Sequence, residues 1–256
     1  MPTKQCRFVR PGVTQTSEFF HTPKVPDGRS IGEVFERIEQ PGAWVALYNI
    51  QTEPEYRRLI DELIDSVRPV VEREQPGIFN PAGYFFISAP PSVTPFHLDS
   101  ENNFWLQARG RKRMTVFDRC DRELVPASAV EEFIIHRSLD GVRLDPALRH
   151  HGRDFDVGPG DGVYFPSTSP HMTSTTAEWA RPGDGVSVSL AITFYTAVTR
   201  QHARVHQCNR VLRRLGVEPR FPGQSRWRDA VKAPLGRLIT AALVKFRNYV
   251  VPPGGA

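Results

Sequence analysis

Two residue types that bind transition metals stand two positions apart in the stretch TPFHLDSENNFWLQARGRKRMTVF, which spans residues 94–117. They are His97 and Asp99, and a third residue of this kind, His171, follows much later in the chain. Two neutral imidazoles and one carboxylate form the ligand set of mononuclear non-haem Fe(II) sites, which leaves three metal positions open. Because an H-x-D pair alone also occurs in surface turns, this hypothesis depends on the residues around it.

A lysine near the pair indicates an anion site. Lys112 shares one face of its expected strand with Met114 and Val116, and burial of an ammonium group on an apolar face is costly unless an anion meets it. A dicarboxylate that chelates the metal at one end needs such a counter-charge at its other end. Thr94, with a hydroxyl to offer the same carboxylate, stands just before the H-x-D pair. The alternative for Lys112 is a solvated strand end between two arginines.

Together with GDGVYFPSTSPH at 160–171, the stretch resembles the Jumonji C and cupin-like group of Fe(II)/2-oxoglutarate-dependent oxygenases. The pattern is similar to that of the asparaginyl hydroxylase that inhibits hypoxia-inducible factor, and more similar still to bacterial cupin-like proteins. The resemblance covers about residues 83–196. It implies a mainly β fold with flanking helices, built on a double-stranded β-helix (jelly-roll, cupin-like) barrel.

The resemblance also implies roles for individual residues. His97, Asp99 and His171 would bind Fe(II), while Lys112 and Thr94 would meet the distal carboxylate of the cosubstrate 2-oxoglutarate. Further residues would line the cosubstrate pocket: Asn103, Trp105, Tyr84, Phe86 and Thr193. At Thr193 this sequence departs from the family, which often has an asparagine there.

The activity that the resemblance implies consumes 2-oxoglutarate and O2, yields succinate and CO2, and hydroxylates a C–H bond of a protein, peptide or small-molecule substrate. We expect hydroxylation rather than demethylation, because the most similar patterns belong to hydroxylases. Two other functions stay open: a metal-dependent cupin enzyme that does not use 2-oxoglutarate, and a non-catalytic cupin-like protein that binds or senses a ligand. The first has no evident need for the Thr94 and Lys112 pair, and the presence of a complete triad together with this pair argues against the second.

The elements that would position these residues are strands flanked by helices. Period-two alternation predicts strands at 43–50, 83–89, 103–108, 112–117, within 155–166 and at 186–196. Helical periodicity predicts helices at 30–40, 55–72 (up to Pro69), 128–136, 200–216 and 225–250. We therefore expect an N-terminal extension at 1–82 that packs on the barrel, a catalytic core at 83–196 and a helical segment at 197–256. The 23 prolines and 19 glycines also favour a strand-rich fold.

The formal net charge of +5 is unevenly distributed. Residues 1–196 carry 21 Lys and Arg against 26 Asp and Glu, whereas residues 197–256 carry 12 against 2. An apolar stripe runs along the last expected helix: Trp227, Val231, Leu235, Leu238, Ile239, Ala242, Leu243 and Phe246. Because similar hydroxylases dimerise through C-terminal helices, we expect a homodimer. Docking on an anionic surface (RNA, a ribosome or lipid headgroups) and arginines that cover the acidic body of the chain are the alternatives.

The cysteines and the apolar runs bear on location. Three widely separated cysteines without a CxxC pair argue against a disulfide framework or a zinc–thiolate site and favour a reducing compartment. The start MPTKQC has no apolar run behind it, and the run at 238–251 is interrupted by Lys245 and Arg247 and too short to span a bilayer. We therefore expect a cytoplasmic protein without a membrane span.

Four further histidines and one cysteine have no place in the expected metal site. His150 and His151 lie in the charged segment RHHGRD, and we interpret them as facing solvent. His202 and His206 are spaced as i and i+4 on an arginine-rich helix without a third ligand nearby, and we interpret them as surface residues. Cys120 is expected to pack or to lie half-exposed.

Overall fold

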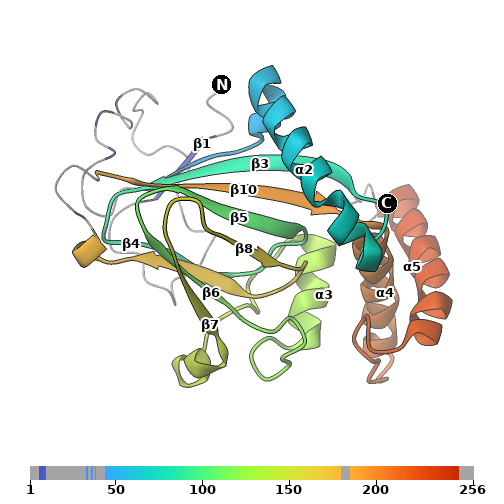
Figure 1. Cartoon of the computed structure of the whole chain (residues 1–256). Helices are drawn as coiled ribbons and strands as arrows, with labels where there is room; N and C mark the ends of the chain where they lie inside the picture. The colour runs from blue at the N-terminus through green and yellow to red at the C-terminus, as the bar shows by residue number, and fades with distance from the viewer. Residues whose placement is uncertain are drawn as a thin grey trace.

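The computed structural model describes residues 6–9, 44–179 and 185–247, with the single positions 33, 36 and 38. The helix expected at 30–40 lies for the most part outside the described residues. Two antiparallel sheets that face each other form the centre of the described part of the chain, and helices flank them (Figure 1). The predicted fold class, mainly β with a cupin-like jelly roll, is confirmed.

Strands that are far apart in the sequence pair in each sheet. The larger sheet contains, in spatial order, β1 (Cys6–Val9), β2 (Trp44–Leu47), β3 (Phe79–Ser88), β10 (Ser187–Tyr195), β5 (Asn102–Arg109) and β8 (Gly162–Phe165). The smaller sheet contains β4 (Ser92–His97), β9 (His171–Thr175), β6 (Lys112–Val116) and β7 (Arg153–Val157). Long-range pairing therefore brings the two metal-binding motifs of the sequence together.

The turn at Gly110, whose φ is 69°, joins β5 to β6 without pairing them. β5 pairs with β10 and β8, whereas β6 pairs with β9 and β7, so the chain crosses from one sheet to the other at this turn. The chain crosses back between β7 and β8. Strands β5 and β6, and likewise β7 and β8, consequently lie in opposite sheets, as in a jelly roll.

Helix α2 (Pro54–Glu74) covers the outer face of the larger sheet (Figure 1). A side chain at Gly83 of β3 would lie 2.4 Å from Ile60, so glycine is what allows the helix to approach this closely. The helix continues through Pro69, where the sequence predicted a disturbance. Pro69 lies on the exposed side, where water can reach the carbonyl that lacks its helical partner.

Strand β10 is buried on both faces. Leu190, Ile192 and Phe194 pack under α2 and its preceding 3-10 helix η3 (Ile50–Thr52). Ala191 and Thr193 alternate with them and line the interior between the sheets. The alternation in the sequence therefore marks an apolar outer layer and a small, polar inner wall.

Three helices lie at one end of the sheets: α3 (Ala127–His136), α4 (Ala197–Arg214) and α5 (Arg226–Arg247). Thr196 caps α4 in a capping box with Thr199. α4 packs against α3 on one side and α5 on the other (Figure 1). The remaining 3-10 helices are η4 (Pro146–His151) and η5 (Ala177–Trp179).

The expected segment boundaries at 1–82, 83–196 and 197–256 stay a prediction. Strand β3 begins at Phe79 and pairs with β2, so it crosses the first of these boundaries. Among the described residues, no helix has the length and apolar character needed to cross a bilayer.

Candidate metal and cosubstrate site

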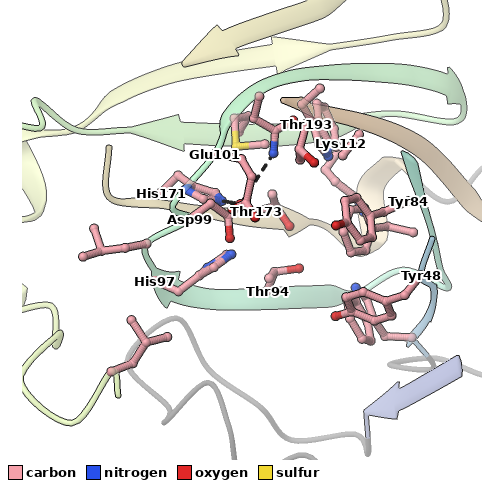
Figure 2. Close-up of a pocket in the computed structure, with 18 of the residues that line it drawn as sticks. Tyr48, Tyr84, Thr94, His97, Asp99, Glu101, Lys112, His171, Thr173 and Thr193 are labelled. Atoms are coloured by element: carbon pink, nitrogen blue, oxygen red, sulfur yellow. Dashed lines mark hydrogen bonds and ion pairs between the residues drawn. The ribbon is translucent and has the colours of Figure 1, made fainter. Parts of the chain in front are cut away.

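The three predicted metal ligands come together at one end of the interior. His97 and His171 are direct cross-strand partners at the ends of β4 and β9, and their ring centroids are 4.1 Å apart. Asp99 follows β4 after one residue, and its Oδ2 lies 3.5 Å from His171 Nε2. One ligand atom from each of the three side chains lies within 4.8 Å of the others, and the side chains point toward one another (Figure 2).

Backbone carbonyls orient both imidazoles. His97 Nδ1 lies 2.7 Å from the carbonyl oxygen of Pro95, and His171 Nδ1 lies 3.1 Å from that of Ser169. Because a carbonyl only accepts hydrogen bonds, each Nδ1 donates to it, so that Nε2 is the ring atom through which a neutral imidazole would bind a metal. Burial, reinforced by the neighbouring His171, lowers the pKa of His97 well below its ordinary value. His97 is therefore neutral, as a metal ligand must be.

Asn103 on β5 supports the carboxylate. Its Nδ2 donates to Asp99 Oδ2 at 3.5 Å, and the backbone carbonyl of Asp99 accepts from the N–H of Thr168 at 2.8 Å. The Oδ1 atom of Asn103 is buried without a hydrogen-bond partner among the described residues. A buried amide oxygen without a partner is unfavourable, so it marks a place where a bound molecule can donate.

The cavity next to the triad has a volume of about 380 Å³ and contains Lys112 in its wall. Lys112 is 2% exposed, and burial lowers its pKa from 10.5 to about 8. Its Nζ lies 5.9 Å from the centroid of the Trp105 ring, and no carboxylate within the described part of the chain pairs with it. The solvated strand end considered from the sequence is therefore wrong for Lys112.

Every other residue predicted for the cosubstrate lines the same cavity. Strand register explains the grouping: Ala191 of β10 lies between Tyr84 of β3 and Trp105 of β5. Thr193 is the cross-strand neighbour of Asn103. Phe86, two positions after Tyr84, and Thr94 of β4 complete the predicted set (Figure 2 labels Thr94, Tyr84 and Thr193). The structure thus brings together all ten predicted site residues, while their roles stay a prediction.

The sequence did not identify several residues that also line the cavity: Trp44, Tyr48, Leu98, Glu101, Met114, Phe133, Arg137, Leu139, Thr173 and Ala191. Strand alternation could have identified Thr173, since it lies two residues after His171 and therefore on the same strand face. Glu101 is held by the hydroxyl of Tyr195, at 2.5 Å, and by that of Ser100, at 2.7 Å. Arg137 ends α3 in a left-handed conformation, with φ of 60°, and no local pattern assigns it to the cavity.

The residues present fit an iron ion and 2-oxoglutarate. Two imidazole Nε2 atoms and a carboxylate are the donors that Fe(II) takes in facial sites. At the wall of the same cavity, the buried Lys112 offers a positive charge that no carboxylate of the described residues neutralises. A chelating dicarboxylate matches this pattern, since one end binds the metal and the other binds the ammonium group.

Two interpretations of residues outside the site require correction. His206 is 1% exposed, with both ring nitrogens buried and no hydrogen-bond partner, so its prediction as a surface residue was wrong. It packs edge-on against Phe221, at 5.1 Å between ring centroids. His202 is half-buried beside Arg119, whose Nη2 lies 3.2 Å from His202 Nδ1. The segment after α4 folds back over both histidines, and it therefore buries His206 fully and His202 in part.

The other two histidines and the cysteine lie near solvent. His150 is exposed, as predicted. His151 is half-buried, and its Nδ1 lies 2.6 Å from Asp121 Oδ2, so it is a hydrogen-bond partner of this carboxylate rather than a free surface group. Cys120 is exposed rather than packed.

Comparisons with known proteins agree with this geometry. Residues 77–198 match the family model described as the JmjC domain. A search of the curated proteins found no match.

Among solved structures, the chain is similar to YcfD, a ribosomal oxygenase from Escherichia coli, with a TM-score of 0.41 and 17% identity over 95% of this chain and 56% of that chain. It is also similar to YcfD in complex with cobalt and 2-oxoglutarate, with a TM-score of 0.40 and 17% identity over 82% and 49% of the two chains. DMSP lyase DddQ from Ruegeria pomeroyi matches with a TM-score of 0.26 and 18% identity over 44% of this chain and 37% of that chain.

The chain spans about half the length of the YcfD chains that it matches, and identities this low say nothing about what it binds or transforms. The assignment therefore depends on the family model and on the motif. Both lie in the same segment, because His97, Asp99 and His171 fall within the matched range. The predicted resemblance to the Jumonji C group is thus confirmed, since residues 77–198 match the family model of the JmjC domain.

Proposed function

We propose that this protein is an Fe(II)- and 2-oxoglutarate-dependent oxygenase that hydroxylates a protein, peptide or small-molecule substrate. The observation that carries the proposal is the pairing, in one cavity, of the His97, Asp99 and His171 cluster with the buried and uncompensated Lys112. Iron and 2-oxoglutarate, when bound together, supply the oxidising chemistry that converts O2 and a C–H bond into a hydroxyl group.

The chain's own residues would bind and orient the reactants. The carbonyls of Pro95 and Ser169 fix the two imidazole rings, and Asn103 holds the carboxylate of Asp99 in place. Lys112 would pair with the distal carboxylate of 2-oxoglutarate in a charge-assisted hydrogen bond. Thr94 would donate its hydroxyl to the same carboxylate. The apolar wall formed by Trp105 and Phe86 would exclude water from the cosubstrate.

We infer hydroxylation rather than demethylation from the motif pattern, which is most similar to that of hydroxylases. The homodimer through the C-terminal helices and the cytoplasmic location stay predictions. The substrate would enter the part of the cavity that metal and cosubstrate leave free, lined in part by Phe133, Arg137 and Leu139.

Anaerobic addition of Fe(II) and 2-oxoglutarate tests the proposal. A chelate of the two at this site gives a weak absorption band in the visible, and exposure to air then gives succinate in the absence of substrate. We expect the band and the succinate in the wild type, and neither in His171→Ala. In Lys112→Ala we expect the band only at much higher 2-oxoglutarate concentrations.

Arg113→Gln is the matched control. Arg113 is the next residue on the same strand, but it points outward and pairs with Asp156 at 2.6 Å, so its loss should leave the band and its concentration dependence unchanged. A metal-dependent enzyme that does not use 2-oxoglutarate would bind Fe(II) without forming the band. A non-catalytic ligand-binding protein would form no succinate in air, and either result would overturn the proposal.

A further inference from the structure

The metal ligands lie beside the two places where the chain crosses between the sheets at this end of the interior. Residues 98–101 join β4 of the smaller sheet to β5 of the larger one, and residues 166–170 join β8 of the larger sheet to β9 of the smaller one. We call them the crossover segments. Asp99 belongs to the first, and His171 directly follows the second.

Sheet pairing does not hold the crossover segments together. The ladder between β4 and β9 ends at the pair of His97 and His171, and the ladder between β5 and β8 begins at the pair of Asn103 and Phe165. The crossover segments lie between these two pairs and belong to neither ladder. Other bonds must therefore fix Asp99 relative to His171, because a metal binds weakly to ligands whose positions are not supported.

Ser167 makes two hydrogen bonds that bridge this gap. Its N–H donates to Oδ1 of Asn102 at 3.0 Å, and its hydroxyl donates to the carbonyl oxygen of Ser100 at 2.8 Å. The N–H of Thr168 adds a third bond, to the carbonyl oxygen of Asp99 at 2.8 Å. We call Ser100, Asn102, Ser167 and Thr168 the clasp. All four are buried, with exposed fractions from 0% at Asn102 to 7% at Ser167, so water competes little for these bonds.

The clasp is itself held in place on both sides. Asn102 Nδ2 donates to Oε1 of Gln75, the residue at the C-terminal cap of α2, at 3.0 Å. Thr168 has a φ of 64°, a left-handed conformation that is unfavourable for a β-branched residue. Such a conformation persists where the surrounding contacts impose it, and it is most frequent at functional sites. The bond from Thr168 to Asp99 is one of these contacts.

We propose that Ser167 is a positioning residue of the metal site, because it holds Asp99 and His171 in their relative places before the metal binds. The inference rests on the proposed function, since the iron of that function is the ion whose ligands it positions. Asp99 Oδ2 lies 3.5 Å from His171 Nε2, and the two side chains lie next to each other (Figure 2).

The hydroxyl of Ser167 acts on both ligands through the backbone. On one side it fixes the carbonyl of Ser100, which directly follows Asp99. On the other side it belongs to the segment whose Ser169 carbonyl orients the His171 ring. Without this bond the crossover segments could move independently, and the metal itself would have to order them. Part of its binding free energy would then be spent on that ordering.

Titration with Co(II), without cosubstrate or substrate, tests the proposal through the visible absorption of the bound ion. We expect Ser167→Ala to bind Co(II) about tenfold more weakly than the wild type, with a changed spectrum because the ligand geometry around the ion changes. With saturating Fe(II), its dependence on 2-oxoglutarate should match that of the wild type, because Lys112 and Thr94 are unchanged. Ser167→Ala keeps the backbone bond to Asn102, so we expect it to fold.

Ser189→Ala is the matched control. Ser189 is 0% exposed, and its hydroxyl donates to Oε1 of Gln107 at 2.8 Å. Its loss removes a buried hydrogen bond of the same kind from β10, outside the crossover segments. In urea unfolding without metal, we expect both variants to be less stable than the wild type by similar amounts. Only Ser167→Ala should also bind Co(II) more weakly.

The outcomes separate this proposal from the proposed function. Equal Co(II) affinity of Ser167→Ala and the wild type would overturn the positioning role and leave the proposed function intact. Equal weakening in Ser167→Ala and Ser189→Ala would also overturn it, because the effect would then come from general loss of stability. A wild type that binds no Co(II) and gives no absorption band with Fe(II) and 2-oxoglutarate would overturn both.

Discussion

Substitution of Lys112 by methionine should stabilise the ligand-free protein and impair its binding of 2-oxoglutarate. Burial lowers the pKa of Lys112 from 10.5 to about 8. A difference of about 2.5 corresponds to roughly 3 kcal/mol at 1.36 kcal/mol for each pKa unit. At pH 7 the amine is protonated in the folded and the unfolded chain, so the folded state carries the whole of this cost. Methionine has a similar length and an apolar stem and leaves no large cavity.

The pH dependence of the free energy of unfolding follows from the same two pKa values of Lys112. Between pH 8 and 10.5 the unfolded chain binds the proton of Lys112 while the folded chain has lost it, so the free energy of unfolding rises with pH over this interval. The rise approaches roughly 3 kcal/mol and should be absent from Lys112→Met. Urea unfolding of the metal-free protein, followed by circular dichroism at pH 7 and pH 10, measures both effects as differences between variant and wild type.

Binding of Fe(II) and 2-oxoglutarate should reverse the order of stability of the wild type and Lys112→Met. Saturating Fe(II) and 2-oxoglutarate stabilise the wild type by mass action, whereas Lys112→Met leaves the buried distal carboxylate without a counter-charge, at a cost of about 2–5 kcal/mol in binding. We therefore expect the variant to unfold at higher urea than the wild type without ligands and at lower urea with them. A variant less stable than the wild type without ligands at pH 7 would refute the reasoning, because Lys112 would then have a partner in the folded protein.

Three further perturbations probe the packing around the site. Gly236→Ala should lower the midpoint of thermal unfolding and expose α5 to proteolysis, because the new methyl group would lie 1.8 Å from the carbonyl oxygen of Arg204. An unchanged midpoint would show that α5 does not pack this closely. Arg213→Met should cost about 3–5 kcal/mol in urea unfolding, since it leaves the carboxylate of Glu131, which is 2% exposed, without its partner at 3.2 Å; a cost below 1 kcal/mol would mean that water reaches Glu131. Burial, and to a smaller extent the charge of Arg119, lowers the pKa of His202 to about 4. The stability that this neutral histidine contributes above pH 6.5 should therefore be lost as the pH falls toward 4. In thermal unfolding, His202→Gln should make this decline shallower.

The metal cluster was predictable because each ligand is marked by its own neighbours. His97 and Asp99 stand in an H-x-D pair that ends a strand, and His171 follows the stretch GDGVYFPSTSP at the start of another. Local patterns of this kind can be recognised in the sequence without knowledge of the tertiary structure. That His97 and His171 are direct cross-strand partners is a long-range fact, and only the resemblance to a family predicted it.

The residues that line the outer parts of the cavity were not predictable, because no local sequence pattern marks them. Trp44 and Tyr48 come from β2 and the segment after it, and Arg137 comes from the end of α3. Each reaches the cavity through sheet pairing or helix docking that joins segments far apart in the chain. Alternation identifies which residues of a strand share a face, but it does not identify which face meets the cavity.

His206 shows where periodicity misleads. The spacing of His202 and His206 correctly places them on one face of α4, and the many arginines around them suggested that this face is solvated. Arginine stems, however, pack along apolar surface while their charged ends reach outward. Arg200 of the same helix lies over the Phe79 ring at 4.1 Å, and the Phe221 ring covers His206. An arginine-rich face can therefore be a buried one.

Lys112 is an unfavourable feature of the ligand-free protein, because it is a buried cation that no carboxylate of the described residues neutralises. A dicarboxylate in the cavity would supply the missing counter-charge. Because a molecule that binds only the folded state stabilises it, the free energy of unfolding should rise with the concentration of 2-oxoglutarate. The site thus costs stability when it is empty, and its ligand restores that stability.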